Sequence, residues 1–202
     1  FGQAGGFHFL LMEFVDGAPI AGPMPLADVV KYGTQICDAL DAAHKKSIVH
    51  RDLKPANIMT TRAGIKLLDF GLAKHVAGDS QHTRSGEVLG TPSYMSPEQA
   101  SGRWRDVDRR SDVYSLGAVL YALLVRRPPF QEGSALATLL SVGQSQPAQP
   151  SVVNPAIEPE LERICLKCLE KDPVKRYPTA AALAQDLDRY LDNDPVVVLK
   201  SA

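Results

Sequence analysis

One eight-residue segment holds the densest group of chemically capable side chains: His50-Arg51-Asp52-Leu53-Lys54-Pro55-Ala56-Asn57. Asp52 could orient a hydroxyl group and accept its proton, while the Asn57 amide could bind a divalent cation that offsets phosphate charge. The five-residue spacing in a tight loop would place both groups on one rim. The segment therefore predicts a site that moves a proton beside a bound metal ion, as phosphoryl transfer requires.

A second carboxylate follows at Asp69, in the tripeptide Asp69-Phe70-Gly71. A carboxylate there could bind the Mg²⁺ that bridges the phosphates of ATP, and Gly71 would leave the backbone free to move. Residues 71–97 are polar and show neither a helical nor a strand period. A loop of this length inside a compact domain is typically functional.

The elements that must position these residues are mainly helical. Residues 26–46 carry an apolar stripe at helical spacing, and residues 112–125 are apolar nearly all round, which predicts a helix buried on every side. Residues 57–60 and 65–68 have the pattern of a β-hairpin, and residues 7–15 that of a buried strand.

Further helices are predicted over residues 134–142, over 161–169, and after Thr179 as N-cap. Proline-rich residues 18–25 and 144–159 are predicted loops. Cys165 and Cys168 fall on an apolar helical stripe, so we interpret them as core residues and not as a metal-binding pair.

Composition limits the function classes. The 202 residues, 45% hydrophobic and 22% charged, suit a soluble domain with a substantial core, and a net charge of −1 gives no general polyanion-binding surface. We therefore expect no nucleic-acid partner. The three cysteines favour a reducing compartment, and no apolar run is long enough to cross a bilayer, so a cytoplasmic location is expected.

Five motifs in order resemble the large (C-terminal) lobe of a eukaryotic-type Ser/Thr protein kinase, of the kind also common in bacteria. They are His-Arg-Asp-Leu-Lys-Pro-Ala-Asn, Asp-Phe-Gly, Gly-Thr-Pro-Ser-Tyr-Met-Ser-Pro-Glu, Ser-Asp-Val-Tyr-Ser-Leu-Gly and Asp-Pro-Val-Lys-Arg-Tyr. The resemblance implies a mainly α fold, α+β when its hinge strand and short β-hairpin are included. It divides the chain into the last small-lobe strand and hinge (1–18), the large lobe (19–192) and a tail or linker (193–202).

The resemblance implies roles for individual residues. Asp52 would be the catalytic base, and Lys54 would contact the transferred γ-phosphate. Asn57 and Asp69 would hold Mg²⁺. Thr91 would pack against Asp52 and Lys54 and support Ser/Thr acceptors.

The same resemblance implies an ATP pocket and a structural frame. Met12 would be the gatekeeper, Glu13 and Val15 would offer backbone groups to adenine, and Met59 would form the pocket floor. Two structural roles also follow: Glu98 would form a buried ion pair with Arg176, and Asp112 would cap the backbone beside Asp52.

Regulation and partners are further implications. Arg51 beside the catalytic carboxylate could receive a phosphate carried by the 72–95 loop, where Thr83 and Ser85 are the best candidates and Ser80 is weaker. Protein substrates with Ser/Thr acceptors are expected. The resemblance leaves room for a dimer of the intact protein and for membrane anchoring by a segment outside these residues.

The sequence departs from the family at its start, because it contains no Gly-rich loop followed by Val and no Val-Ala-x-Lys. We interpret Phe1 as a truncated start and expect these 202 residues alone to bind ATP weakly and transfer phosphate negligibly. Two alternatives stay open: a catalytically inactive kinase-like scaffold and a small-molecule phosphotransferase. The intact Asp52, Asn57 and Asp69 argue against the first, and Lys54 with Gly90-Thr91-Pro92 argues against the second.

Overall fold

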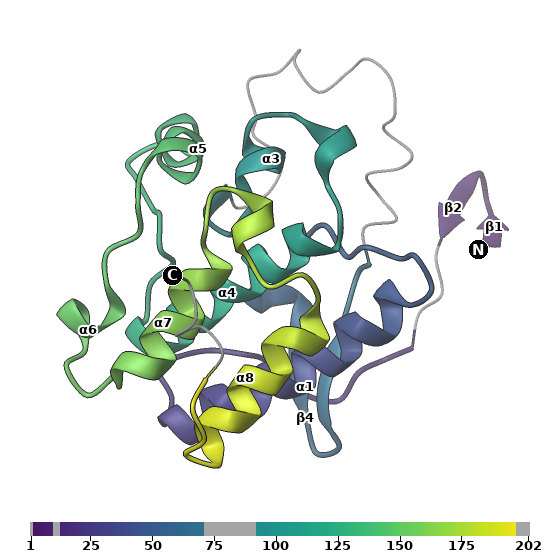
Figure 1. The fold of residues 1–202 in the computed structure, drawn as a ribbon. Coiled ribbons are helices and arrows are strands. Elements are labelled where there is room, and N and C mark those ends of the chain that lie inside the picture. The colour runs from purple at the N-terminus through teal and green to yellow at the C-terminus, as the bar shows by residue number, and fades with distance from the viewer. Residues whose placement is uncertain (1, 10–12, 71–91, 197–202) are drawn as a thin grey trace.

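A computed structural model describes residues 2–9, 13–70 and 92–196, and helices dominate it (Figure 1). The longer helices are α1 (Leu26–His44), α4 (Arg109–Val125), α5 (Ala135–Gln144), α7 (Pro159–Cys168) and α8 (Ala180–Leu191). The short helices are α3 (Pro97–Ala100) and α6 (Pro150–Val153), with single 3-10 turns at η1 (Pro55–Asn57), η2 (Pro92–Tyr94), η3 (Trp104–Asp106) and η4 (Pro173–Lys175). The strands are β1 (Gly2–Ala4), β2 (Phe7–Phe9), β3 (Ala18–Pro19), β4 (Ile58–Thr61) and β5 (Gly64–Leu67).

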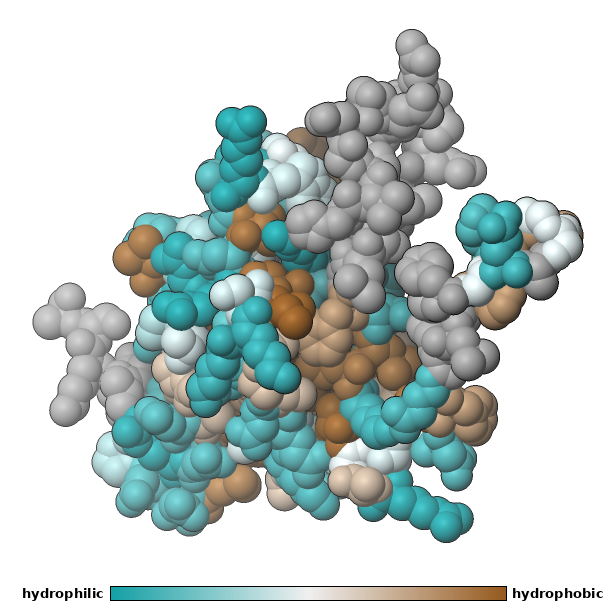
Figure 2. Space-filling view, turned by 90° about the vertical axis from the view of Figure 1, so that its right-hand side faces the viewer, coloured by the Kyte–Doolittle hydropathy of each residue, from teal (hydrophilic) through white to brown (hydrophobic). Residues whose placement is uncertain are grey.

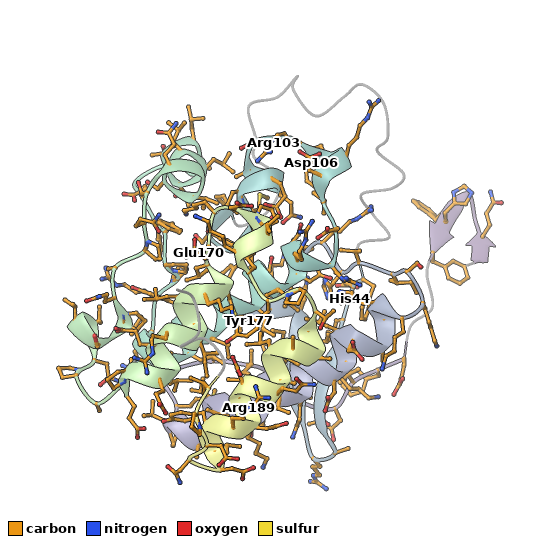
Figure 3. The ribbon with its side chains drawn as sticks, in the orientation of Figure 1. His44, Arg103, Asp106, Glu170, Tyr177 and Arg189 are labelled. Carbon is orange, nitrogen blue, oxygen red and sulfur yellow. The ribbon has the colours of Figure 1, made fainter. Side chains whose placement is uncertain are left out.

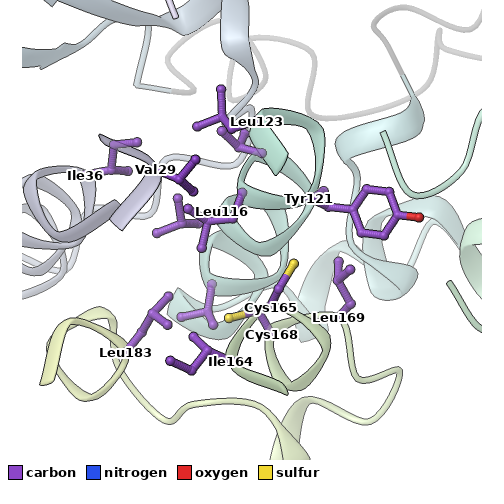
Figure 4. Close-up of a cluster of buried hydrophobic side chains, with 14 of the residues drawn as sticks. Val29, Ile36, Leu116, Tyr121, Leu123, Ile164, Cys165, Cys168, Leu169 and Leu183 are labelled. Carbon is purple, nitrogen blue, oxygen red and sulfur yellow. The ribbon is translucent and has the colours of Figure 1, made fainter. Parts of the chain in front are cut away.

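Helix α4 is the centre of the molecule, with α1, α7 and α8 packed around it (Figures 1 and 4). Every residue from Ser111 to Val125 is buried, which confirms the prediction of a helix enclosed on all sides. Close packing requires a glycine here, because a Cβ on Gly117 would collide with the Cβ of Cys168 on α7. Packing of the hydrophobic core is therefore sufficient to fix the position of α4.

The paired cysteines are core residues, as the sequence predicted. Cys165 and Cys168 are free thiols with no exposed surface, and burial raises the pKa of both. Figure 4 shows both sulfur atoms among aliphatic side chains between α4 and α7. Neutral thiols in this setting behave as small hydrophobic groups.

Helix α1 and the hairpin confirm two more predictions from periodicity. The three-stranded antiparallel sheet has the order β3-β4-β5, with Met59 opposite Lys66 across the β4–β5 pair. Helix α1 packs against β5 and α8. Helix α8 begins after Thr179, whose hydroxyl accepts a hydrogen bond from the Ala182 N–H, as predicted for an N-cap.

The prediction of a buried strand over residues 7–15 is wrong. Only β2 (Phe7–Phe9) is a strand in the described part, and it pairs with β1 in a two-stranded ribbon that stands away from the helical body (Figures 1 and 2). Phe7 and Phe9 are 78% and 49% exposed. The apolar pattern is that of a buried strand, but no further layer covers either face of this ribbon within the described residues.

Two predicted loops contain short elements. β3 lies within residues 18–25 and pairs with β4, while α6 lies within residues 144–159 and starts at Pro150, a residue well suited to the first turn of a helix. Val196, in the predicted tail, is 2% exposed and belongs to the core. None of the described helices is long and apolar enough to span a membrane.

Helix α4 ends at a strained residue, and this generates a stability prediction. The C-cap residue Arg126 has a φ of 67°, in the left-handed region, where its N–H donates to the Ala122 carbonyl. The left-handed conformation costs a side-chain-bearing residue about 1–2 kcal/mol. Arg126→Gly should therefore raise the free energy of unfolding by about 1 kcal/mol, measured by urea titration. The neighbouring exposed Arg127 has no positive φ, so Arg127→Gly should give no gain; equal gains in both variants would contradict the explanation.

Candidate active site

The backbone of residues 50–57, which we call the 50–57 loop, is held by Asp112 in the first turn of α4. The two carboxylate oxygens of Asp112 accept the His50 N–H at 2.8 Å and the Arg51 N–H at 2.9 Å. Asp112 is fully buried, and Arg51 has a φ of 66°. The Arg51 carbonyl accepts a hydrogen bond of 2.7 Å from Gln99 on α3. Two helices thus fix the loop in an unusual backbone conformation, in agreement with the predicted capping role of Asp112.

The loop brings three of the four predicted catalytic residues together. The Asp52 Oδ2 atom lies 3.0 Å from the Lys54 ammonium and 3.2 Å from the Asn57 side-chain nitrogen. Asn57 also donates to the Asp52 carbonyl at 2.8 Å, which leaves its Oδ1 atom as the oxygen available for a metal ion. Asp52 and Lys54 keep 28% and 22% of their side-chain surface exposed, so solutes can reach them. Thr91, the fourth residue, lies outside the described residues.

His50 links the 50–57 loop to the segment that carries Asp69. Its Nε2 atom donates to the Leu68 carbonyl at 2.9 Å, and its Nδ1 atom accepts the Asp52 N–H at 3.3 Å. Burial lowers the pKa of His50, and this effect exceeds the opposing effect of the Asp112 charge. The lowered pKa favours the neutral ring that both hydrogen bonds require. The ring also packs on Phe70, with 4.7 Å between centroids. His50 is therefore a structural residue.

Asn57 and Asp69 are the two residues predicted to hold Mg²⁺, and that role stays a prediction. The Leu68 N–H donates to the Asn57 carbonyl at 2.9 Å, which brings the residue before Asp69 beside Asn57. Asp69 is exposed, with a φ of 53°. The described residues contain no cluster of three or more His, Cys, Asp or Glu side chains that could hold a metal by themselves. Mg²⁺ typically takes one or two protein oxygens and fills its remaining positions with water and substrate phosphates, so this sparse oxygen set fits it.

The residues predicted to contact adenine are described in part. Met59 is half-buried on β4, and the ammonium of its cross-strand neighbour Lys66 pairs with the Glu13 carboxylate. Val15 is half-buried, and Met12 lies outside the described residues. Figure 2 shows the face that lies on the right-hand side of Figure 1, where hydrophobic residues gather near the middle and hydrophilic residues lie around them. The contacts of these residues with a nucleotide stay a prediction.

The predicted ion pair between Glu98 and Arg176 is present and buried. The two terminal guanidinium nitrogens lie 2.8 and 2.9 Å from the two carboxylate oxygens, and the Ser111 hydroxyl donates to the same carboxylate. The remaining three N–H groups of Arg176 donate to the carbonyls of residues 170, 110 and 171. All five donors are satisfied, so the pair joins α3, α4 and the segment before α8, in which Figure 3 labels Tyr177.

Two residues of this frame were missed in the sequence. Gln99 also accepts the Ser96 N–H, and the spacing Ser-x-x-Gln is a capping-box signal that could have located the start of α3 but not the bond to Arg51. His44, at the end of α1, lies 2.7 Å from Asp112 through its Nε2 atom. Nothing in the local pattern marks that contact, because the two residues are 68 positions apart.

The comparisons with known proteins agree with this geometry. Residues 6–187 match the family described as "Protein kinase domain". The chain belongs to the protein kinase family. It is similar to the serine/threonine-protein kinase PknB of Mycobacterium leprae, with 40% identity over 96% of this chain and 32% of that protein. It is also similar to the serine/threonine-protein kinase Pkn1 of Myxococcus xanthus, with 43% identity over 89% of this chain and 27% of that protein.

Two solved structures share the kinase fold. A mutant form of the PknI kinase domain of Mycobacterium tuberculosis has a TM-score of 0.66 and 26% identity over 89% of this chain and 64% of that one. Rad53 1-466 in complex with AMP-PNP has a TM-score of 0.69 and 25% identity over 86% of this chain and 44% of that one. These findings confirm the resemblance to a bacterial-type Ser/Thr kinase and the mainly α fold of the large lobe.

The buried ion pair generates a prediction about stability and pH. Burial alone would raise the pKa of Glu98, but the hydrogen bonds and charge of Arg176 outweigh it and lower the pKa to about 2, from an ordinary value of 4.5. Glu98→Gln should reduce the free energy of unfolding by about 3–5 kcal/mol, because Arg176 keeps a buried charge without its counter-ion. Urea titration at neutral pH measures the loss.

The sign of the pH effect follows from the direction of the pKa shift. A lowered pKa in the folded state stabilises the fold above about 4.5, and this contribution is lost as the pH falls toward 2. The variant should lack this part of the acid sensitivity. Arg103→Gln, which breaks the exposed pair with Asp106, is the matched control and should cost less than about 1 kcal/mol. An equal cost for both variants would contradict the role given to burial.

Proposed function

We propose that the intact protein transfers the γ-phosphate of ATP to serine and threonine hydroxyls of protein substrates. The observation that carries the proposal is the contact of Asp52 with Lys54 and Asn57 on a loop held from both sides. Family membership supports the same reaction class. Because the chain spans 32% and 27% of the two relatives named above, the activity, substrates and partners of the whole protein are proposed here.

Each residue contributes a separate part of the reaction. Asp52 orients the acceptor hydroxyl and takes its proton as the oxygen attacks phosphorus. Lys54 is close enough to Asp52 to bring a positive charge to the transferred phosphate. Asn57 and Asp69 would hold Mg²⁺, which neutralises phosphate charge when bound. The fixed loop supports catalysis because positioning and electrostatics supply most of the rate enhancement in phosphoryl transfer.

The partners follow from this activity: ATP with Mg²⁺, and proteins that present serine or threonine. Met12, Glu13, Val15 and Met59 are proposed to contact the adenine end, and Thr91 to support the acceptor. A cytoplasmic kinase region is part of the proposal, whereas a dimer of the intact protein stays a prediction. The negligible phosphate transfer expected of these 202 residues alone also stays a prediction.

The decisive variant is Asp52→Asn in the intact protein, which keeps the shape of the side chain but removes the proton acceptor. Phosphate transfer from Mg²⁺-ATP to a generic protein acceptor should fall by about 10²–10⁴-fold, measured with radiolabelled ATP. Asp192→Asn changes an exposed aspartate at the end of α8 and should keep full activity. Wild-type protein without transferase activity would support the scaffold alternative. Undiminished activity in Asp52→Asn would refute the role of Asp52.

A further inference from the structure

The peptide unit that joins Arg51 to Asp52 is held at both of its polar groups. Its carbonyl oxygen, on Arg51, accepts a hydrogen bond of 2.7 Å from the side-chain nitrogen of Gln99. Its N–H, on Asp52, donates to the His50 Nδ1 atom at 3.3 Å. A peptide unit is rigid and planar, so its orientation sets the direction in which the next side chain leaves the backbone. The two hydrogen bonds therefore influence where the Asp52 carboxylate points.

The two contacts come from different parts of the chain. His50 belongs to the 50–57 loop itself, so its hydrogen bond moves with the loop. Gln99 lies on α3, 48 positions further along the chain. Arg51 has a φ of 66°, a left-handed conformation that a residue with a side chain keeps only when its surroundings hold it there. Gln99 supplies one of the contacts that hold it from outside the loop.

The hydrogen bonds of Gln99 define the orientation of its amide group. Its Oε1 atom accepts the Ser96 N–H at 3.1 Å and the Ser96 hydroxyl at 3.2 Å. The Ser96 N–H can only donate and the Arg51 carbonyl can only accept, so just one orientation of the amide satisfies both. Gln99 is 4% exposed and Ser96 is fully buried. The Gln99 side chain is therefore a fixed bridge between Ser96 and Arg51.

The Ser96 end of this bridge belongs to a well-packed segment, residues 92–96. The Met95 N–H donates to the Pro92 carbonyl at 3.1 Å, and both η2 and α3 pack against α5 (Figure 1). In the sequence, the segment directly follows Thr91, the residue proposed above to support the acceptor. Gln99 thus joins the segment after the proposed acceptor support to the loop that carries the proposed base.

We propose that Gln99 is a positioning residue for phosphate transfer. Its hydrogen bond to the Arg51 carbonyl orients the peptide before Asp52, and its contact with Ser96 keeps that peptide aligned with residues 92–96. Glutamine suits both ends because its amide has an N–H donor and an oxygen acceptor. The effect on the reaction rate rests on the proposed function, whereas the orientation of the peptide does not.

The test compares two variants of the intact protein. Gln99→Met keeps an unbranched side chain of similar length but removes both hydrogen-bonding groups. Gln99→Glu keeps acceptor oxygens for Ser96 and removes the donor to Arg51. Each should lower kcat for phosphate transfer to a generic protein acceptor by about tenfold, corrected for the folded fraction, because one positioning hydrogen bond is lost. KM for Mg²⁺-ATP should stay unchanged, since a loss confined to the transition state leaves substrate binding intact.

A second measurement reads the peptide itself by NMR. The carbonyl carbon of Arg51 and the amide nitrogen of Asp52 should shift in both Gln99 variants. Ser101→Ala is the matched control, because it removes a 2.7 Å hydrogen bond to the Pro97 carbonyl in the same short helix and does not touch the loop. This control should keep both resonances and the full kcat.

Each outcome bears on a separate part of the proposal. Unshifted resonances in folded Gln99 variants would overturn the orienting role of the hydrogen bond. Shifted resonances with an undiminished kcat would overturn the positioning role in catalysis, as would an equal loss of kcat in Ser101→Ala. Wild-type protein without transferase activity would overturn the proposed function and the effect on kcat with it, while the NMR measurement would still decide whether Gln99 orients the peptide.

Discussion

The structure depends on one buried carboxylate. Asp112 has no exposed surface, and its two oxygens accept hydrogen bonds from the backbone of residues 50 and 51 and from the ring of His44. A buried carboxylate is costly unless its hydrogen bonds are made, so the loop and the helix hold each other in place. Helix α4 is hydrophobic and is enclosed by the neighbouring helices. Because Asp112 lies in its first turn, this enclosure also buries the Asp112 carboxylate.

A second set of contacts secures the other side of the loop. Gln99 holds the Arg51 carbonyl, and the adjacent Glu98 is tied to Arg176 near the start of α8. Helix α3 is only four residues long and could not keep this position alone. The buried ion pair therefore fixes the short helix that holds the 50–57 loop, which carries the candidate active-site residues. Replacing Glu98 or Arg176 would lower the stability of the fold and would thereby also disturb the position of the 50–57 loop.

The features that could be predicted from the sequence are those that a local residue pattern determines. Apolar periodicity located α1 and α4, the hairpin pattern located β4 and β5, and the motif from His50 to Asn57 identified a group of side chains that the structure brings within hydrogen-bonding distance. The contacts of His44 and Gln99 were missed because each joins residues far apart in the chain. The pattern of residues 7–15 was misleading because burial of a strand depends on what covers it, which its own residues do not encode.

Amide hydrogen exchange at His50 and Arg51 in an Asp112→Asn variant tests the central claim most directly. The substitution keeps the shape of the side chain but turns one acceptor oxygen into an N–H₂ group that faces a backbone donor. Protection of these two amides should fall by about tenfold or more, because hydrogen bonds to a charged group are lost, while amides within α4 such as Val119 and Leu120 keep theirs. Unchanged protection at His50 and Arg51 in a folded variant would contradict the account.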